Sequence, residues 1–293
     1  MEIQTRVGLG ILLALIGGLS ISIDIPMIRL AEANPWVTML MRGIGLSSVL
    51  GLILIFGRKY TDTPTNPFDD RNWVEIGVLF GLSSIFFTIS VFHTSTANLV
   101  FILAFNPMLA ALLSWWMFGE RPDFVTWLAI VLTIVGITII VAGGVDSGAL
   151  FGNLTSLATA FLLALSITRS RQSGKDLSLS GCLGGMVTAL FALPLAYANF
   201  EMPTYPMWLF INVFVLVPIS GFSLTLAPRF IPAAQVAMFF LLETVLAPVW
   251  VWLIFAEIPT NATLIGGMIV LLTVAGHSFW QVWYMQRPMP KPA

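Results

Sequence analysis

Four ionisable side chains lie within or at the ends of long apolar runs in this 293-residue chain: Asp24, Arg42, His93 and Glu243. Placing such a group at bilayer depth costs roughly 2.5–3.5 kcal/mol, so each one requires a partner or a water-filled surface. Glu243 lies about ten residues into its run, near the middle of a membrane-length helix. Its carboxylate either binds the amino group of a solute, exchanges a proton, or accepts hydrogen bonds that hold neighbouring helices together.

The other three groups each have a functional and a structural interpretation. Arg42 could bind a solute carboxylate through a forked pair of hydrogen bonds, or extend to the nearby membrane interface. Asp24, followed closely by Arg29 and Glu32, favours a structural ion pair or turn, although its apolar surroundings leave solute binding open. His93 closes its run and could exchange a proton near neutral pH, or simply be hydrogen-bonded.

Two segments of the chain are versions of one another. NLVFILAFNPMLAALLSWWMFGERP begins at Asn98 and QVAMFFLLETVLAPVWVWLIFAEIP begins at Gln235, and both end in an aromatic residue, a small residue, Glu, one further residue and Pro. Aligned without a gap, Asn98 matches Gln235 and Asn106 matches Glu243. Each copy therefore carries two polar positions eight residues apart, within about 80° on a helix. This internal repeat predicts a duplicated architecture.

Both copies also carry a proline at mid-helix. Pro107 would free the carbonyl group of Leu103, and Pro248 that of Thr244, which gives either a solute-binding irregularity or a packing kink. Large apolar side chains near these positions could form an adaptable wall for a solute, or could face lipid and core. They are Met39, Phe101, Met238, Phe239 and Trp250.

The composition requires a bilayer around these residues. Hydrophobic residues make up 58% of the chain, charged residues only 9%, and the mean hydropathy is +0.94. We predict an all-α integral membrane protein with ten spans. They are 7–30, 35–56, 73–92, 97–118, 124–142, 149–168, 177–197, 205–227, 233–255 and 262–284. The first run lacks a cleavage site and is predicted to be a helix rather than a removed signal.

Other classes of partner are disfavoured by the residues. Cys182 is the only cysteine, which excludes a disulfide within the chain, and the two histidines lie in distant runs without a metal-ligand pattern. Basic residues do not cluster as a nucleic-acid partner would require. The chain also lacks a phosphate-binding loop with lysine, an HExxH motif and a GxSxG motif. We therefore predict no cofactor, no metal and no enzymatic activity.

Charge sets the predicted orientation. Eleven of the thirteen Lys and Arg residues fall at the N-terminus, at the C-terminus or in loops on the same side, the exceptions being Arg29 and Arg42. The positive-inside rule then places both termini in the cytoplasm, in a plasma membrane that we expect to be the bacterial inner membrane. Five spans separate the two copies of the repeat, so residues 1–146 and 147–293 are predicted to be inverted five-helix repeats around a central cavity.

The segments TSTANLVFILAFNP, FGERP and LLETVLAPVWVWLIFAEIP resemble the drug/metabolite transporter superfamily, specifically its ten-helix EamA-type exporters. The resemblance extends over nearly the whole chain. It implies a substrate cavity between two inverted repeats and a secondary transporter that works by alternating access. Arg42 and Glu243 suggest the subgroup that exports amino acids, including aromatic ones, and compounds such as paraquat.

The expected partners are thus a small-molecule substrate and the lipid bilayer, with the protein as a monomer or a homodimer. A channel or a membrane sensor of a small metabolite is the alternative, and an intramembrane enzyme is the least favoured class.

Overall fold

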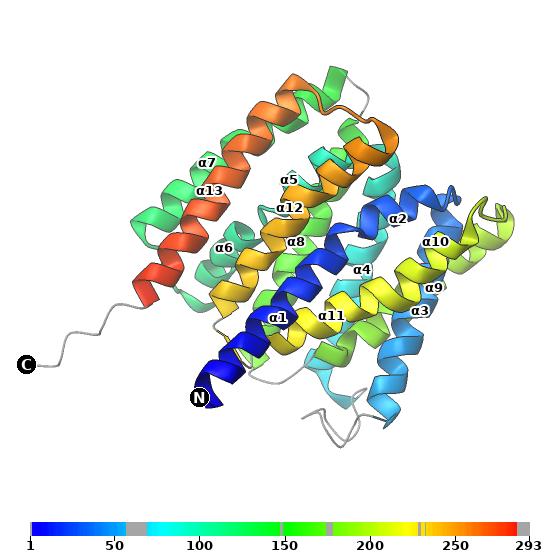
Figure 1. Ribbon diagram of the computed structural model, residues 1–293, viewed down its shortest axis with the longest axis horizontal. Coiled ribbons are helices and arrows are strands. Elements are labelled where there is room, and N and C mark those ends of the chain that lie inside the picture. Colours follow the sequence, from blue (N-terminus) through cyan, green and yellow to red (C-terminus); the bar gives the residue numbers. More distant parts are fainter. Residues whose placement is uncertain are drawn as a thin grey trace, which may run out of the picture.

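The computed structural model describes residues 2–56, 69–146, 149–173, 178–227, 230–231 and 233–285, all of whose regular structure is helical. The helices form one elongated bundle (Figure 1). In chain order they are α1 Glu2–Ser22, α2 Asp24–Leu30, α3 Pro35–Phe56, α4 Arg71–His93, α5 Thr96–Leu103, α6 Asn106–Phe118, α7 Phe124–Asp146, α8 Leu150–Ser173, η3 Ser178–Ser180, α9 Gly181–Ala198, α10 Pro206–Ile211, η4 Asn212–Leu216, α11 Val217–Leu226, α12 Ala233–Phe255 and α13 Asn261–Met285.

These elements confirm the predicted all-α membrane protein. Within the described ranges nine stretches are long and apolar enough to span a bilayer, and Phe239–Phe255 of α12 is a shorter apolar stretch. Each predicted span corresponds to one helix or to consecutive helical segments. The division into repeats at residues 146 and 147 stays a prediction, and residue 147 lies outside the described ranges.

Local sequence explains where the helices begin and end. The Asp70 carboxylate accepts a hydrogen bond from the backbone N–H of Asn72 and caps α4, while the Ser95 hydroxyl accepts one from Asn98 and caps α5. Gly119 ends α6 with φ of +72°, a conformation that glycine adopts without strain. Ala256, its counterpart in the repeat alignment, follows α12 with φ of +54°. The two repeat helices thus end in the same way.

Three of the described spans contain an irregular turn, and a polar residue lies in that turn or directly after it. The first span is divided at Ile23, immediately before Asp24, and the fourth at Ala104 and Phe105, immediately before Asn106. The eighth contains the π-helical segment η4, which begins at Asn212. Pro107 occupies the second position of α6, where its missing N–H costs no helix bond, whereas Pro248 lies inside the undivided α12.

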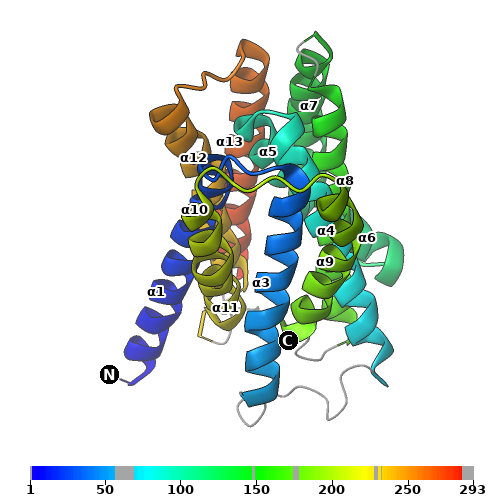
Figure 2. The same ribbon diagram turned by 90° about the vertical axis from the view of Figure 1, so that its right-hand side faces the viewer.

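Helices pack in a few close pairs. α3 packs against α9, α4 against α8 and α9, α7 against α13, and α1 against α11 and α12 (Figures 1 and 2). Small residues allow the approach of α4 to α9, because a Cβ atom built on Gly81 would lie 2.7 Å from the carbonyl oxygen of Gly184. A Cβ atom built on Gly77 would lie 2.9 Å from the carbonyl oxygen of Ser180, directly before α9. These glycines therefore serve packing within the chain.

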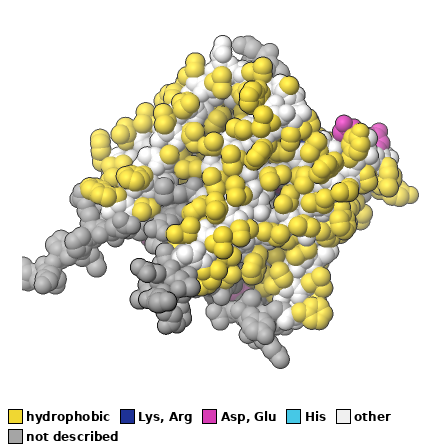
Figure 3. Space-filling model, in the orientation of Figure 1, with side chains coloured by type: hydrophobic (Ala, Val, Ile, Leu, Met, Phe, Trp, Pro, Cys, Tyr) yellow, Lys and Arg dark blue, Asp and Glu magenta, His cyan; other side chains and the backbone are white. Residues whose placement is uncertain are grey.

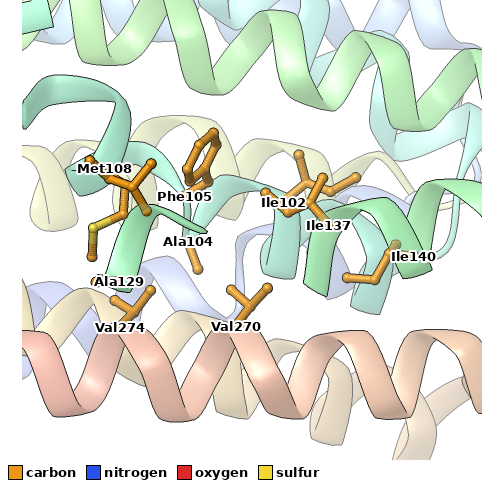
Figure 4. Close-up of a cluster of buried hydrophobic side chains, with 10 residues drawn as sticks. Ile102, Ala104, Phe105, Met108, Ala129, Ile137, Ile140, Val270 and Val274 are labelled. Carbon is orange, nitrogen blue, oxygen red and sulfur yellow. The ribbon is translucent and has the colours of Figure 1, made fainter. Parts of the chain in front are cut away.

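The largest buried cluster joins α5, α6, α7 and α13. Figure 4 shows Ile102, Phe105 and Met108 in one cluster with Val270 and Val274 of α13. The outer surface is equally apolar: hydrophobic side chains cover most of the face in Figure 3, with acidic side chains visible at its edge. An apolar interior and an apolar exterior together are what a lipid-embedded bundle requires.

The α7–α13 contact gives a stability prediction. A Cβ atom on Gly266 would collide with the carbonyl oxygen of Gly136, whereas one on Gly276 of the same helix meets nothing within 4 Å. We expect Gly266→Ala to destabilise the protein by about 1–3 kcal/mol, because backbone must move. Gly276→Ala is the matched control and should be neutral or slightly stabilising. Thermal unfolding in detergent measures both, and equal melting temperatures would contradict the prediction.

Candidate functional site

The break in the first span holds a buried ion pair. The Arg42 guanidinium of α3 donates two hydrogen bonds to the Asp24 carboxylate, with Nη1 2.6 Å from Oδ1 and Nη2 3.1 Å from Oδ2. The side chains of Arg42 and Asp24 are only 12% and 6% exposed. Arg42 also lies over the Phe87 ring of α4, 5.2 Å from its centroid. The guanidinium is therefore held inside the bundle rather than extended to the membrane interface.

Asn212 completes this cluster from the eighth span. Its amide nitrogen donates to Oδ1 of Asp24 at 2.7 Å and to the Asp24 backbone carbonyl at 3.2 Å, while its amide oxygen accepts from Nη1 of Arg42 at 3.2 Å. The side chain is fully buried. Asn212 thus satisfies a backbone acceptor at the break and binds both members of the ion pair. Ile23, the residue that precedes α2, forms no side-chain capping hydrogen bond of its own.

Helix α12 brings Trp250 and Glu243 to the same break. The Trp250 indole N–H donates to the Ser22 hydroxyl at 3.2 Å, and Gly18 lies against the Phe239 backbone. Ser22 lies four residues after Gly18 on α1, and Glu243 lies four residues after Phe239 on α12. The two helices run parallel and four residues rise about 6 Å, so Ser22 and Glu243 lie at the same depth. Glu243 is partly exposed.

The charges at this level do not balance. Asp24 and Arg42 neutralise one another, whereas among the described residues Glu243 has no ion pair and no hydrogen-bond partner. A carboxylate in that position can bind a cation or a proton from outside the protein. Over the same residues, no three His, Cys, Asp or Glu side chains come together as metal ligands.

A second polar cluster lies near the end of the bundle that carries the α2–α3 and α12–α13 loops, which we call the predicted outer end. Asn98 donates to the side-chain oxygens of Thr94 at 3.3 Å and Asn153 at 3.2 Å, and accepts from the Thr263 hydroxyl at 2.6 Å. Thr94 donates to Asn153 at 2.6 Å. We call these four residues the Asn98 network. They join α5, α8 and α13.

An ion pair lies beside this network. Arg29 of α2 bonds to the Glu257 carboxylate and also donates to the Thr94 carbonyl at 3.1 Å. The second Glu257 oxygen accepts from the Thr96 backbone N–H at 3.3 Å. Glu257 follows α12, and its partners belong to the first half of the chain. The predicted outer end is therefore tied together across the two halves.

Several predicted site residues lie apart from the ion pair. His93 is exposed, bonds within its own helix to the Ile89 carbonyl at 2.8 Å and packs edge-on against Phe151. The Asn106 amide donates to the Ala160 carbonyl of α8 at 3.1 Å. Met39 is fully buried with Ile85 and Ala192, Phe101 packs on Gly267, and Phe239 packs against the Ala14 cluster. The side chains of Gln235 and Met238 lie outside the described part of the structure.

The structure thus places Asp24, Arg42, Glu243 and Trp250 at one break. Of the other predicted residues that it describes, Asn98 lies in the Asn98 network, His93 and Asn106 form separate contacts, and Met39, Phe101 and Phe239 pack against neighbouring helices. Sequence reasoning missed Asn212, Ser22 and Phe87. Asn212 had a detectable signal, since it is a lone amide in the apolar run INVFVLV. Sequence reasoning paired Asp24 with neither Arg42 nor Asn212, because these partners come from other spans.

Comparisons with known proteins agree with this architecture. Residues 8–142 match the EamA-like transporter family. The chain is 24% identical to the pseudopaline exporter CntI of Pseudomonas aeruginosa (strain UCBPP-PA14) over 200 residues, which is 67% of this chain and 70% of that protein. A solved crystal structure shares the fold, with a TM-score of 0.61 and 15% identity, over 95% of this chain and 99% of the other. As the sequence resemblance predicted, the chain carries an EamA-like transporter domain of the drug/metabolite transporter superfamily, and it is an integral membrane protein related to small-solute exporters.

Proposed function

We propose that this protein is a secondary transporter that exports small organic solutes by alternating access, with amino acids, including aromatic ones, and toxic organic cations as its substrates. The observation that carries the proposal is the Glu243 carboxylate at the break of the first span, which has no ion-pair partner in the part of the chain that the structure describes. The similarity to the pseudopaline exporter supports the direction of transport. The proposal includes a location in the bacterial inner membrane, with both termini on the cytoplasmic side, as the distribution of basic residues predicts.

The proposal includes two inverted five-helix repeats, and the packing of the helices supports them. Exchanging each span for its equivalent five spans away turns the α4–α8 contact into the α11–α1 contact. The same exchange turns the packing of α5 and α6 on α8 into that of α12 on α1, and leaves the α3–α9 and α7–α13 pairs unchanged. Equivalent helix pairs therefore recur in the two halves. This equivalence would allow the two halves to exchange conformations during transport.

Alternating access requires one end to be closed while the other admits the solute. At the predicted outer end, bonds from Glu257, Asn153 and Thr263 to the first half hold the two halves together. Both halves of the fourth span, α5 and α6, pack on α7 and α8, but the outer half, α5, also packs on α12 and α13. The described contacts thus support an outward-closed state.

This closure can be tested with a single introduced thiol. In a Cys182→Ser background, Thr96→Cys places a thiol in a buried position, where the native hydroxyl has no hydrogen-bond partner within the described ranges. We expect Glu257→Gln to raise its labelling by an external, impermeant maleimide at least threefold, because a charged hydrogen bond is worth about 1.5–3 kcal/mol. His93→Cys, at an exposed site beside it, should label equally in both backgrounds. Unchanged labelling of Thr96→Cys would show that the ion pair does not hold the outer end.

Counterflow in proteoliposomes tests the function itself. Purified protein is reconstituted with unlabelled solute inside, and uptake of radiolabelled aromatic, aliphatic and charged amino acids and of paraquat is measured. A carrier gives a transient, saturable overshoot. Flux that neither saturates nor overshoots would indicate a channel, and binding without flux a sensor. Absence of exchange for every compound by correctly folded protein would remove this substrate assignment.

A further inference from the structure

The ion pair at the break of the first span restricts what a solute can bind there. Asp24 occupies both terminal nitrogens of the Arg42 guanidinium, and Asn212 shares Nη1. A solute carboxylate could reach this fork only by displacing Asp24, which would leave a buried carboxylate without its cation. The Nε–H of Arg42 has no hydrogen-bond partner among the described residues, but it is buried. Arg42 is therefore a poor receptor for a carboxylate as long as Asp24 holds its terminal nitrogens.

Asn212 keeps this arrangement in place. Its amide nitrogen donates twice to Asp24, to Oδ1 and to the backbone carbonyl, and its oxygen accepts from Arg42. These three bonds orient the Asp24 carboxylate toward the guanidinium at the point where the helix is interrupted. An asparagine at the start of a π-helical turn is thus the positioning residue of the ion pair.

What the site offers to a ligand is instead a carboxylate without an ion-pair partner among the described residues, together with the Trp250 indole on the same helix. Glu243 and Trp250 are seven residues apart on α12, which places them on one face about 10 Å apart along the axis. The hydrogen bond to Ser22 fixes the orientation of the Trp250 indole. A carboxylate and an aromatic face are the two groups that bind an organic ammonium ion. One added positive charge also balances Asp24, Arg42 and Glu243.

We infer that the site recognises its solute through a protonated amine on an apolar body, at Glu243 and Trp250, and that a carboxylate on the solute is not part of recognition because Asn212 commits Arg42 to Asp24. The inference rests on the proposed transport function and sharpens its substrate class. Amines without a carboxyl group are substrates of the same site, whereas acids without a free amine are not.

Binding of three matched probes to the purified protein tests the inference separately from transport. They are phenylethylamine, which lacks the carboxylate, phenylalanine, which has both groups, and N-acetylphenylalanine, which lacks the free amine. We expect phenylethylamine to bind within about threefold of phenylalanine, and N-acetylphenylalanine at least tenfold more weakly. Glu243→Gln should weaken phenylethylamine binding at least tenfold.

Asn212→Leu tests the positioning role. Freeing Arg42 should improve phenylalanine binding relative to phenylethylamine at least threefold, a change of ratio that a general loss of folding does not produce. Ser220→Ala is the control, because this buried hydroxyl on the same span has no hydrogen-bond partner among the described residues. An unchanged ratio in Asn212→Leu would overturn that role.

The main inference is overturned if N-acetylphenylalanine binds as tightly as phenylethylamine, if phenylethylamine binds at least tenfold more weakly than phenylalanine, or if no probe binds. Counterflow distinguishes these results from failure of the proposed function. If only zwitterions exchange, the proposed transport function stands and the inferred recognition of amines is wrong. If no compound exchanges, the proposed transport function itself is wrong.

Discussion

Glu243→Gln reduces solute counterflow at least tenfold, while the protein still folds and inserts in the membrane. Glutamine preserves the volume of the side chain and removes the negative charge. A hydrogen bond to a charged partner contributes about 1.5–3 kcal/mol, which corresponds to roughly a 10- to 150-fold change in binding. Folding should survive, because Glu243 has no hydrogen-bond or ion-pair partner among the described residues. Initial rates of counterflow in proteoliposomes, with thermal unfolding in parallel, measure both effects.

The matched control for this loss is Glu75→Gln. Glu75 pairs with Arg169 at 3.0 Å on the surface of the bundle, and its side chain is 35% exposed. Exposed ion pairs contribute about 0–1 kcal/mol, so exchange and stability should remain near those of the unaltered protein. Saturable exchange at an unchanged rate in Glu243→Gln would remove this carboxylate from the mechanism. A lower melting temperature in Glu243→Gln would instead assign it a structural role.

The spans were predictable from sequence because each one carries its own signal. A run of about 20 apolar residues can be recognised without knowledge of the fold. Polar residues such as Asp70 and Ser95 indicate where helices begin, because they cap the first turn. The interruption before Asn106 lies next to Pro107, a residue that predicts an irregularity in that helix. Pro248 occupies the equivalent position of an undivided helix. Proline thus marks a weak point, and the tertiary contacts decide whether the helix is interrupted there.

The pairing of charges was not predictable in the same way. Asp24 has Arg29 five residues away, yet it binds Arg42, and Arg29 instead binds Glu257 from the other half of the chain. Both choices follow from which helices pack together, and single-sequence hydropathy contains no information on that. The importance of Asn212 has the same origin: an amide in an apolar run signals a buried polar contact without revealing its partner.

Breaking the Asp24–Arg42 pair should be the most destabilising single change at the site. Arg42→Met removes the cation and leaves the Asp24 carboxylate buried with only Asn212 as its partner. The expected cost is about 3–5 kcal/mol, most of it the penalty of an uncompensated buried charge. Because methionine retains the apolar length of the side chain, little packing is lost.

The double variant Asp24→Asn with Arg42→Met separates charge from packing. With both charges gone, the neutral amide can still exchange hydrogen bonds with Asn212, so most of the lost stability should return. Arg169→Met provides the surface comparison, since its side chain is 40% exposed and its pair with Glu75 contributes about 0–1 kcal/mol. Thermal unfolding in one detergent measures all three. If the double variant is no more stable than Arg42→Met, the ion pair is not the source of the loss, and the Phe87 contact beneath the guanidinium becomes its cause.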